Sequence, residues 1–112
     1  MFKIDAIIQP GKLEPVRRAL AVIGVDGMTV SEVRGHGRQK GHKEVYRGRE
    51  YTVDLRPKIR IEMVVPDNRK DEVVQALADA ARSGEIGDGK IFVETVLQAV
   101  RIRNDDRDDL AL

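Results

Sequence analysis

The chain has no cysteine and no tryptophan, and it contains only two Phe and two Tyr in 112 residues. Without cysteine there is no disulfide framework, no thiolate metal site and no thiol nucleophile, and the chain needs no oxidising compartment. So few aromatic rings leave little for base stacking, and aliphatic side chains and subunit contacts must supply most of the packing. We therefore expect a cytoplasmic protein with an aliphatic core.

Long apolar runs are also absent. No stretch approaches the roughly 20 consecutive apolar residues that span a bilayer. The N-terminal segment, Met1-Phe-Lys-Ile-Asp-Ala-Ile-Ile, lacks the long apolar run of a signal peptide. We expect any membrane contact to go through a partner protein. The length is typical of one compact domain, over residues 1–112.

Charge is balanced overall but unevenly distributed. The net charge is +1, yet residues 34–60 hold nine Arg and Lys against three acids, and the tail 104–112 holds four Asp and one Arg. A basic segment can attract phosphates, nucleic acid or an acidic protein surface. Charge alone does not choose among these partners. We expect the acidic tail to be solvated and partly disordered.

Hydrophobic periodicity predicts the element order β-α-β-β-α-β. Strands are predicted over 2–9, 28–35, 59–65 and 91–97, helices over 13–23 and 73–81, and a short extended piece over 100–103. In the second strand we expect Met28 and Val30 to be buried. This order is typical of the ferredoxin-like α+β fold, in which an antiparallel sheet carries both helices on one face. The other face then needs cover, which oligomerisation would supply.

Residues 37–56 form the longest segment without a convincing period. The segment is charged, contains three glycines and has few apolar residues to bury. Loops of this length are usually functional. Tyr51 lies within it, where its hydroxyl could be modified or contact a partner, or could simply lie at the surface. The flanking motif 35–41, with three glycines, Arg38, Gln39 and Lys40, could hold a phosphate or a dicarboxylate, or could be a solvated turn.

A second glycine motif, Gly84-Glu-Ile-Gly-Asp-Gly-Lys90, fits the pattern G-x-x-x-x-G-K. Ile91 stands where a P-loop needs Ser or Thr, and the motif joins a helix to a strand, so a P-loop NTPase is not expected. The spacing fits a helix C-cap and turn with a surface lysine equally well. Arg101 and Arg103, two apart in an extended segment, would point the same way and favour anion binding.

Taken together, these segments resemble the PII family of nitrogen-regulatory signal proteins, from residue 3 to residue 103. The resemblance rests on five ordered motifs: Gly27-Met-Thr-Val-Ser-Glu-Val, Gly35-x-Gly-Arg-Gln-Lys-Gly41, Tyr46-Arg-Gly-x-Glu-Tyr51, Arg82-x-Gly-x-Ile-Gly-Asp-Gly-Lys-Ile-Phe92 and Val100-Arg-Ile-Arg103. It implies a homotrimer of ferredoxin-like subunits with three clefts between neighbours. Each cleft would bind ATP or ADP competitively, and no catalytic residue is implied.

The resemblance also implies roles for individual residues. The adenine end would be bordered by Thr29, Gly35 and Val64. The phosphates would be held by Gly37, Arg38, Gly87, Asp88, Gly89 and Lys90, together with Arg101 and Arg103, of which Arg103 would come from the adjacent subunit. Gln39 would ligate the magnesium of MgATP, and this magnesium would chelate 2-oxoglutarate. The 2-oxoglutarate site would comprise Gln39, Lys40, Gly41 and Lys58.

In the PII family the long loop reports the bound ligands to partners. By resemblance, the flexible loop 37–56 would contact an ammonium transporter, a nucleotidylyltransferase, or enzymes and regulators of nitrogen metabolism. Tyr51 would be the position of uridylylation or adenylylation, whereas Arg49 excludes the serine phosphorylated in cyanobacteria. Three departures bear on ligand preference: His36 replaces an aromatic residue, Gly11 replaces a common Phe, and Asn104-Asp-Asp replaces Thr-Gly-Glu.

Three other functions share this fold or this chemistry. A ferredoxin-like RNA-binding module would need a cluster of sheet aromatics, which the sequence lacks, so no nucleic acid partner is expected. An acylphosphatase-like or nucleotide-hydrolysing enzyme would show steady turnover, whereas a sensor that grips triphosphate would hydrolyse it weakly at most. A divergent PII-like protein would sense adenine nucleotides with another effector or with none.

Overall fold

The computed structural model describes residues 1–37, 43–46, 49–52 and 55–112, with no side chains for 43–46 and 49–52. The main elements are β1 (Phe2–Ile8), α1 (Leu13–Val22), β2 (Thr29–Gly35), β5 (Arg56–Val65), α2 (Lys70–Ala81) and β6 (Gly89–Thr95). They follow the predicted order and form a ferredoxin-like α+β fold. In the described part of the chain, no helix is both long and apolar enough to cross a membrane.

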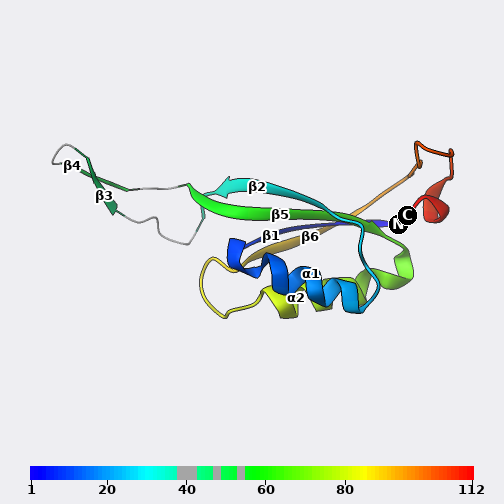
Figure 1. Ribbon diagram of the computed structural model, residues 1–112, viewed down its shortest axis with the longest axis horizontal. Helices are drawn as coiled ribbons and strands as arrows, with labels where there is room; N and C mark the ends of the chain where they lie inside the picture. Colours follow the sequence, from blue (N-terminus) through cyan, green and yellow to red (C-terminus); the bar gives the residue numbers. More distant parts are fainter. Residues whose placement is uncertain (38–42, 47–48, 53–54) are drawn as a thin grey trace.

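The four strands form one antiparallel sheet in the order β2-β5-β1-β6. Strand β1 is central and pairs on both sides, so that Ile4 faces Met63 on β5 and Val93 on β6. Both helices cover the same face of this sheet (Figure 1). The arrangement confirms the predicted fold class, and it leaves the second face of the sheet without helices.

An aliphatic core lies between the sheet and the helices. Alternate residues of β1 and β5 face the helices, because side chains of a strand point to opposite faces in turn. The core side chains that are almost completely buried are Ile4, Ile8, Val16, Leu20, Ile61, Val73 and Leu77. No aromatic ring belongs to this cluster among the described residues, as the composition led us to expect.

The end of α1 lies close to the end of the predicted helix 13–23, and Gly24 directly after it explains the stop. Gly24 has a φ of 78°, a left-handed conformation that glycine adopts without strain. Its N–H donates to the carbonyl of Ala21 at 2.9 Å, and the N–H of Val25 donates to that of Leu20 at 2.9 Å. This is the Schellman pattern, which satisfies the last helical carbonyls and turns the chain toward β2.

The helix-free face of the sheet carries a network of paired charges. Arg60 donates to both carboxylate oxygens of Asp5, at 3.0 and 2.6 Å. A carboxylate oxygen of Glu62 lies 3.0 Å from Arg60 and 3.0 Å from Lys3. The hydrogen bonds from Arg60 hold the pKa of Asp5 below its ordinary value, and Glu62 raises the pKa of Lys3. We call this surface, with Ile7, Lys90 and Phe92 of the same face, the open face.

Within 37–56 the structure corrects the prediction of a segment without regular structure. Strand β3 (Lys43–Tyr46) pairs antiparallel with β4 (Arg49–Thr52), and β5 begins at Arg56 rather than at residue 59. The expectation was wrong because single β-formers such as Val45 and Tyr51, spaced by charged residues, are enough for a two-stranded ribbon. A two-stranded ribbon can form without a continuous apolar face, so hydrophobic periodicity does not reveal it.

Four further expectations fail, two of them in the strands at the edges of the sheet and two in the segment after β6. Strand β6 spans 89–95 rather than 91–97, and Val30 of β2 is 41% exposed because β2 is an edge strand. The extended piece over 100–103 is also wrong: the N–H of Asp105 donates to the Arg101 carbonyl at 2.8 Å, which makes a turn. The acidic tail is ordered, with a 3-10 helix over Asp108–Ala111.

Truncation of a core side chain on α2 tests this account of the packing. Leu77→Ala should lower the free energy of unfolding by about 2–5 kcal/mol, because it removes a fully buried side chain and leaves a cavity. Val22→Ala, at a position that is 87% exposed, should change it by less than about 0.5 kcal/mol. Urea unfolding at one fixed protein concentration would measure both. Equal losses in the two variants would contradict this account of the core.

Candidate functional site at the loop end of the sheet

All four strands of the sheet begin or end where the long segment 37–56 leaves and rejoins the sheet. Gly35 pairs with Arg56, so β2 ends and β5 begins at the same sheet end (Figure 1). Ile8, the last residue of β1, pairs with Ile59 on β5 and with Gly89 on β6. The chain after β1, the start of β5 and the turn before β6 are therefore neighbours. This end is the candidate site.

The turn 84–88 is shaped by the side chain of Asp88. One carboxylate oxygen accepts from the backbone N–H of Ser83 at 2.9 Å and of Gly84 at 2.8 Å, and the other accepts from the Ser83 hydroxyl. The hydroxyl first, and then the two backbone donors, lower the pKa of Asp88. The carboxylate of Asp88 therefore organises the turn.

Glycine is required where this turn enters β6. Gly87 and Gly89 have φ values of 100° and 106°. A Cβ added to Gly89 would lie 1.7 Å from the backbone oxygen of Ile7, which no rotation of a side chain can relieve. The glycine spacing that resembled a phosphate motif thus also lets β6 approach the end of β1 closely.

Lys58 of β5 and Gln9, the residue after β1, converge on this turn. Lys58 is only 8% exposed, and its Nζ donates to the carbonyl of Gly87 at 2.9 Å. The Nε2 of Gln9 donates to the same carbonyl at 2.7 Å. Burial lowers the pKa of Lys58, and the nearby charge of Arg56 adds to this effect. Gln9 was missed in the sequence analysis. Only the register of β1 on β5 places it beside Lys58, and no local sequence pattern reveals that register.

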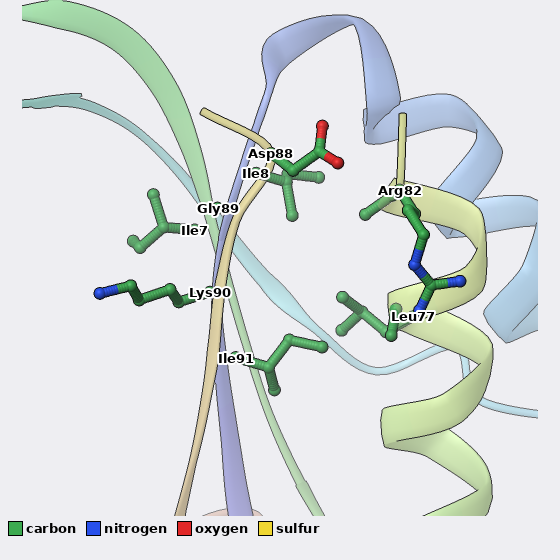
Figure 2. Close-up of a pocket in the computed structure, with 10 residues that line it drawn as sticks. Ile7, Ile8, Leu77, Arg82, Asp88, Gly89, Lys90 and Ile91 are labelled. Carbon is green, nitrogen blue, oxygen red and sulfur yellow. The ribbon is translucent and has the colours of Figure 1, made fainter. Parts of the chain in front are cut away.

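Two hollows flank the site, and they differ in character. One, of about 220 Å³, lies between α2 and β6 and is walled mainly by Ile8, Leu77 and Ile91. Lys90 and Ile7 point away from these residues, to the opposite side of β6 (Figure 2). The other, of about 450 Å³, lies beside Lys58 and is lined by Pro10, Glu32, Val33, Arg34, Pro57, Lys58 and Ile59. Of these two hollows, the second is the one that the buried Lys58 lines, together with Arg34 and Glu32.

Other predicted site residues lie toward the opposite end of the molecule. Thr29 pairs with Glu62, and Val64 is six residues beyond Lys58 along β5, about 20 Å at the usual rise of a strand. Arg101 follows the far end of β6, where its guanidinium contacts Asp106 at 3.2 Å and the Leu112 carbonyl oxygen at 3.4 Å. The exposed Arg103 follows in the same turn. Figure 1 shows this segment at the end of the molecule opposite to the one where β2 ends and β5 begins.

One chain therefore divides the predicted nucleotide residues into two groups. Gly37, Gly87, Gly89 and Lys90 lie at or next to the loop end, whereas Thr29, Val64, Arg101 and Arg103 lie toward the far end. Gly35, predicted with the adenine group, lies at the loop end instead. Arg38, Gln39, Lys40 and Gly41 lie outside the described residues. Tyr51 lies in β4 opposite Glu44, and its side chain is outside the description.

Comparison with known proteins identifies the family. The model of the family described as Nitrogen regulatory protein P-II matches residues 1–106. The chain belongs to the P-II family. It is 57% identical to Nitrogen regulatory protein P-II 1 of Escherichia coli (strain K12), 56% to Nitrogen regulatory protein P-II of Klebsiella oxytoca and 53% to that of Haemophilus influenzae. Each alignment covers all 112 residues of this chain and the whole relative.

Membership in the P-II family confirms the resemblance seen in the sequence and gives the general function. P-II proteins are regulatory signal proteins of nitrogen metabolism that act on partner proteins, and they are not known as enzymes. The structure adds that Gly35, the turn before Gly89 and Lys58, which are far apart in the sequence, gather at one end of the sheet in this P-II chain.

Gly89→Ala tests the close approach of β6 to β1. It should lower the free energy of unfolding by about 3 kcal/mol or more, because the added Cβ meets backbone and the conformation is left-handed. The matched control is Gly84→Ala, which has a φ of 90° but open space around its Cβ and should cost about 1–2 kcal/mol. Chemical denaturation compares the two. A Gly89→Ala variant no less stable than Gly84→Ala would refute the contact.

Proposed function

We propose that this P-II family protein is a homotrimeric sensor of cellular energy, carbon and nitrogen status. It binds ATP or ADP competitively in clefts between subunits, binds 2-oxoglutarate together with MgATP, and responds through the 37–56 segment. The observation that carries the proposal is the division of the nucleotide residues between opposite ends of one chain. A second copy would bring the far-end group of one subunit to the loop-end group of its neighbour.

The open face supports such an assembly. It carries both signs of charge in the network of Asp5, Arg60 and Glu62, and it exposes 53% of Phe92. The segment after β6 also exposes Leu97 and Ile102 almost fully. Apolar side chains of this size, together with a paired charge network on a helix-free sheet face, are suited to contact with other subunits.

In the proposed cleft the phosphates lie at the loop end. Lys90 faces the open side of β6, and the glycines at 37, 87 and 89 allow close approach of backbone N–H groups. Arg38 of the same subunit, with Arg101 and Arg103 of its neighbour, would neutralise the remaining charge. Asp88 contributes by organising the turn, and the adenine would lie against Thr29 and Val64 of the neighbour.

Lys58 suits the far carboxylate of 2-oxoglutarate. A buried ammonium requires partners, and a carboxylate forms a stronger, charge-assisted hydrogen bond than a neutral carbonyl does. The hollow of about 450 Å³ beside Lys58 gives a small dicarboxylate room to approach. Magnesium, ligated by Gln39, would join the triphosphate to the keto acid, whose remaining contacts would come from the backbone of Lys40 and Gly41.

Regulation then needs no chemical step. Ligands that bind one arrangement of the 37–56 segment better than another shift its population, and that segment selects the partner. Suitable partners are an ammonium transporter, a nucleotidylyltransferase, and enzymes or regulators of nitrogen metabolism in the cytoplasm. Uridylylation or adenylylation of Tyr51 would add bulk and negative charge to this segment. Weak ATP hydrolysis is compatible with the proposal.

Calorimetric titration of 2-oxoglutarate tests the ligand assignment. We expect binding in the presence of magnesium and ATP, and none with ADP or after magnesium is removed by EDTA. Lys58→Ala should weaken it by about 10- to 100-fold, the usual worth of a hydrogen bond to a charged group. Lys70→Ala, at the far end of the fold, should bind 2-oxoglutarate with the affinity of the unmodified protein. Arg38→Ala should weaken the binding of ATP. Intact ATP binding without any 2-oxoglutarate binding would favour the divergent sensor.

Sedimentation equilibrium tests the assembly. The protein should have a mass near three times the 12.5 kDa of one chain. Phe92→Asp places a charge on the open face opposite Asp5 and should shift the equilibrium toward monomers. The control Val22→Asp adds the same charge at an exposed position of α1 and should stay trimeric. A monomeric unmodified protein, or equal behaviour of both variants, would contradict the proposed interface.

A further inference from the structure

The carbonyl of Gly87 lies between the proposed dicarboxylate site at Lys58 and the proposed phosphate turn before β6. It accepts hydrogen bonds from Gln9 Nε2 at 2.7 Å and from Lys58 Nζ at 2.9 Å. The donors follow from the register: Ile8 pairs with Ile59 and with Gly89, so the next position on each strand brings Gln9, Lys58 and the turn together.

Two donors on one carbonyl restrict the orientation of its peptide group. A carbonyl oxygen has two lone pairs, and here it has two donors, one from β5 and one from the residue after β1. The peptide joins Gly87 to Asp88, directly before Gly89 and Lys90. Whatever holds this carbonyl therefore also sets the direction of the turn that the proposed function assigns to phosphate.

Lys58 is constrained through the same atom. Its ammonium is buried, and a buried ammonium without hydrogen-bond partners would be costly. An ammonium carries three N–H donors, so Lys58 can keep the Gly87 carbonyl and still donate to a carboxylate. The direction in which it presents itself to an anion depends on where the Gly87 carbonyl lies, and Gln9 is the second donor that fixes that carbonyl.

We propose that Gln9 is a positioning residue that links the dicarboxylate site at Lys58 to the phosphate turn through the Gly87 carbonyl. The inference rests on the proposed function, because it takes 2-oxoglutarate and MgATP as the two ligands. Gln9 touches neither ligand in this scheme. It acts by keeping one carbonyl in the orientation that serves both Lys58 and the turn.

The test separates coupling from simple support of the turn. In Gln9→Leu the amide donor is lost at similar side-chain size, and 2-oxoglutarate affinity in the presence of MgATP should fall about tenfold, near the net worth of one hydrogen bond. MgATP affinity measured alone should stay within about threefold, because Lys58 still holds the carbonyl. Gln75→Leu, which removes an exposed glutamine that donates to Asp79 on α2, is the control and should change neither.

A charged variant tests whether the side chain at position 9 acts on 2-oxoglutarate binding through Lys58. Gln9→Glu replaces the donor with a carboxylate, which repels the Gly87 carbonyl and pairs with Lys58 itself. We expect 2-oxoglutarate to bind at least tenfold more weakly in Gln9→Glu than in Gln9→Leu, since the lysine is already neutralised. Circular dichroism and urea midpoints would establish that both variants fold.

Ligand-free NMR of 15N-labelled lysine ammonium groups gives a readout that needs no ligand. Lys58 should give a slowly exchanging signal in the unmodified protein, and Gln9→Leu should shift and broaden it, whereas Gln75→Leu should not. An unchanged Lys58 signal, equal 2-oxoglutarate affinities in Gln9→Leu and the unmodified protein, or an equal loss of MgATP and 2-oxoglutarate affinity would each overturn the inference. Failure of the unmodified protein to bind 2-oxoglutarate would instead overturn the proposed ligand, whatever the variants do.

Discussion

Pairing of β1 with β5 on one side and with β6 on the other is the constraint on which the rest of the structure depends. Its register places Ile4, Ala6 and Ile8 toward the helices and therefore defines the aliphatic core. The same register places Gly89 against the end of β1, so closely that only glycine fits. A shift by one residue would exchange the two faces, expose the core side chains and separate Lys58 from the turn.

The same pairing leaves one face of the sheet for other chains. Because both helices pack on one side, the charges of Lys3, Asp5, Arg60 and Glu62 must satisfy one another on the other side. A paired network of this kind can meet a second subunit without an unpaired buried charge. This face and the separation of the nucleotide residues are independent observations, and both support the proposed assembly of subunits.

Much of the fold could be predicted from local pattern, and the failures have a common cause. Strand β1, helix α1 and the stop at Gly24 were readable because their periodicity or backbone geometry is local. The β3–β4 ribbon, the shift of β6 and the exposure of Val30 depend on partners rather than on period. The turn at Arg101 likewise depends on Asp105 and Asp106, residues that the sequence suggested would be solvated.

The candidate site shows the same division. The family, the element order, the glycine motifs and the residue types that suit phosphate and carboxylate could be predicted from the sequence, because these are properties of short segments. The folded chain was needed to show that Asp88 organises the turn, that Lys58 and Gln9 share the Gly87 carbonyl, and that Arg101 and Arg103 lie at the opposite end of the chain. Hydrogen bonds between residues 29 and 78 positions apart depend on strand register, which no local pattern contains.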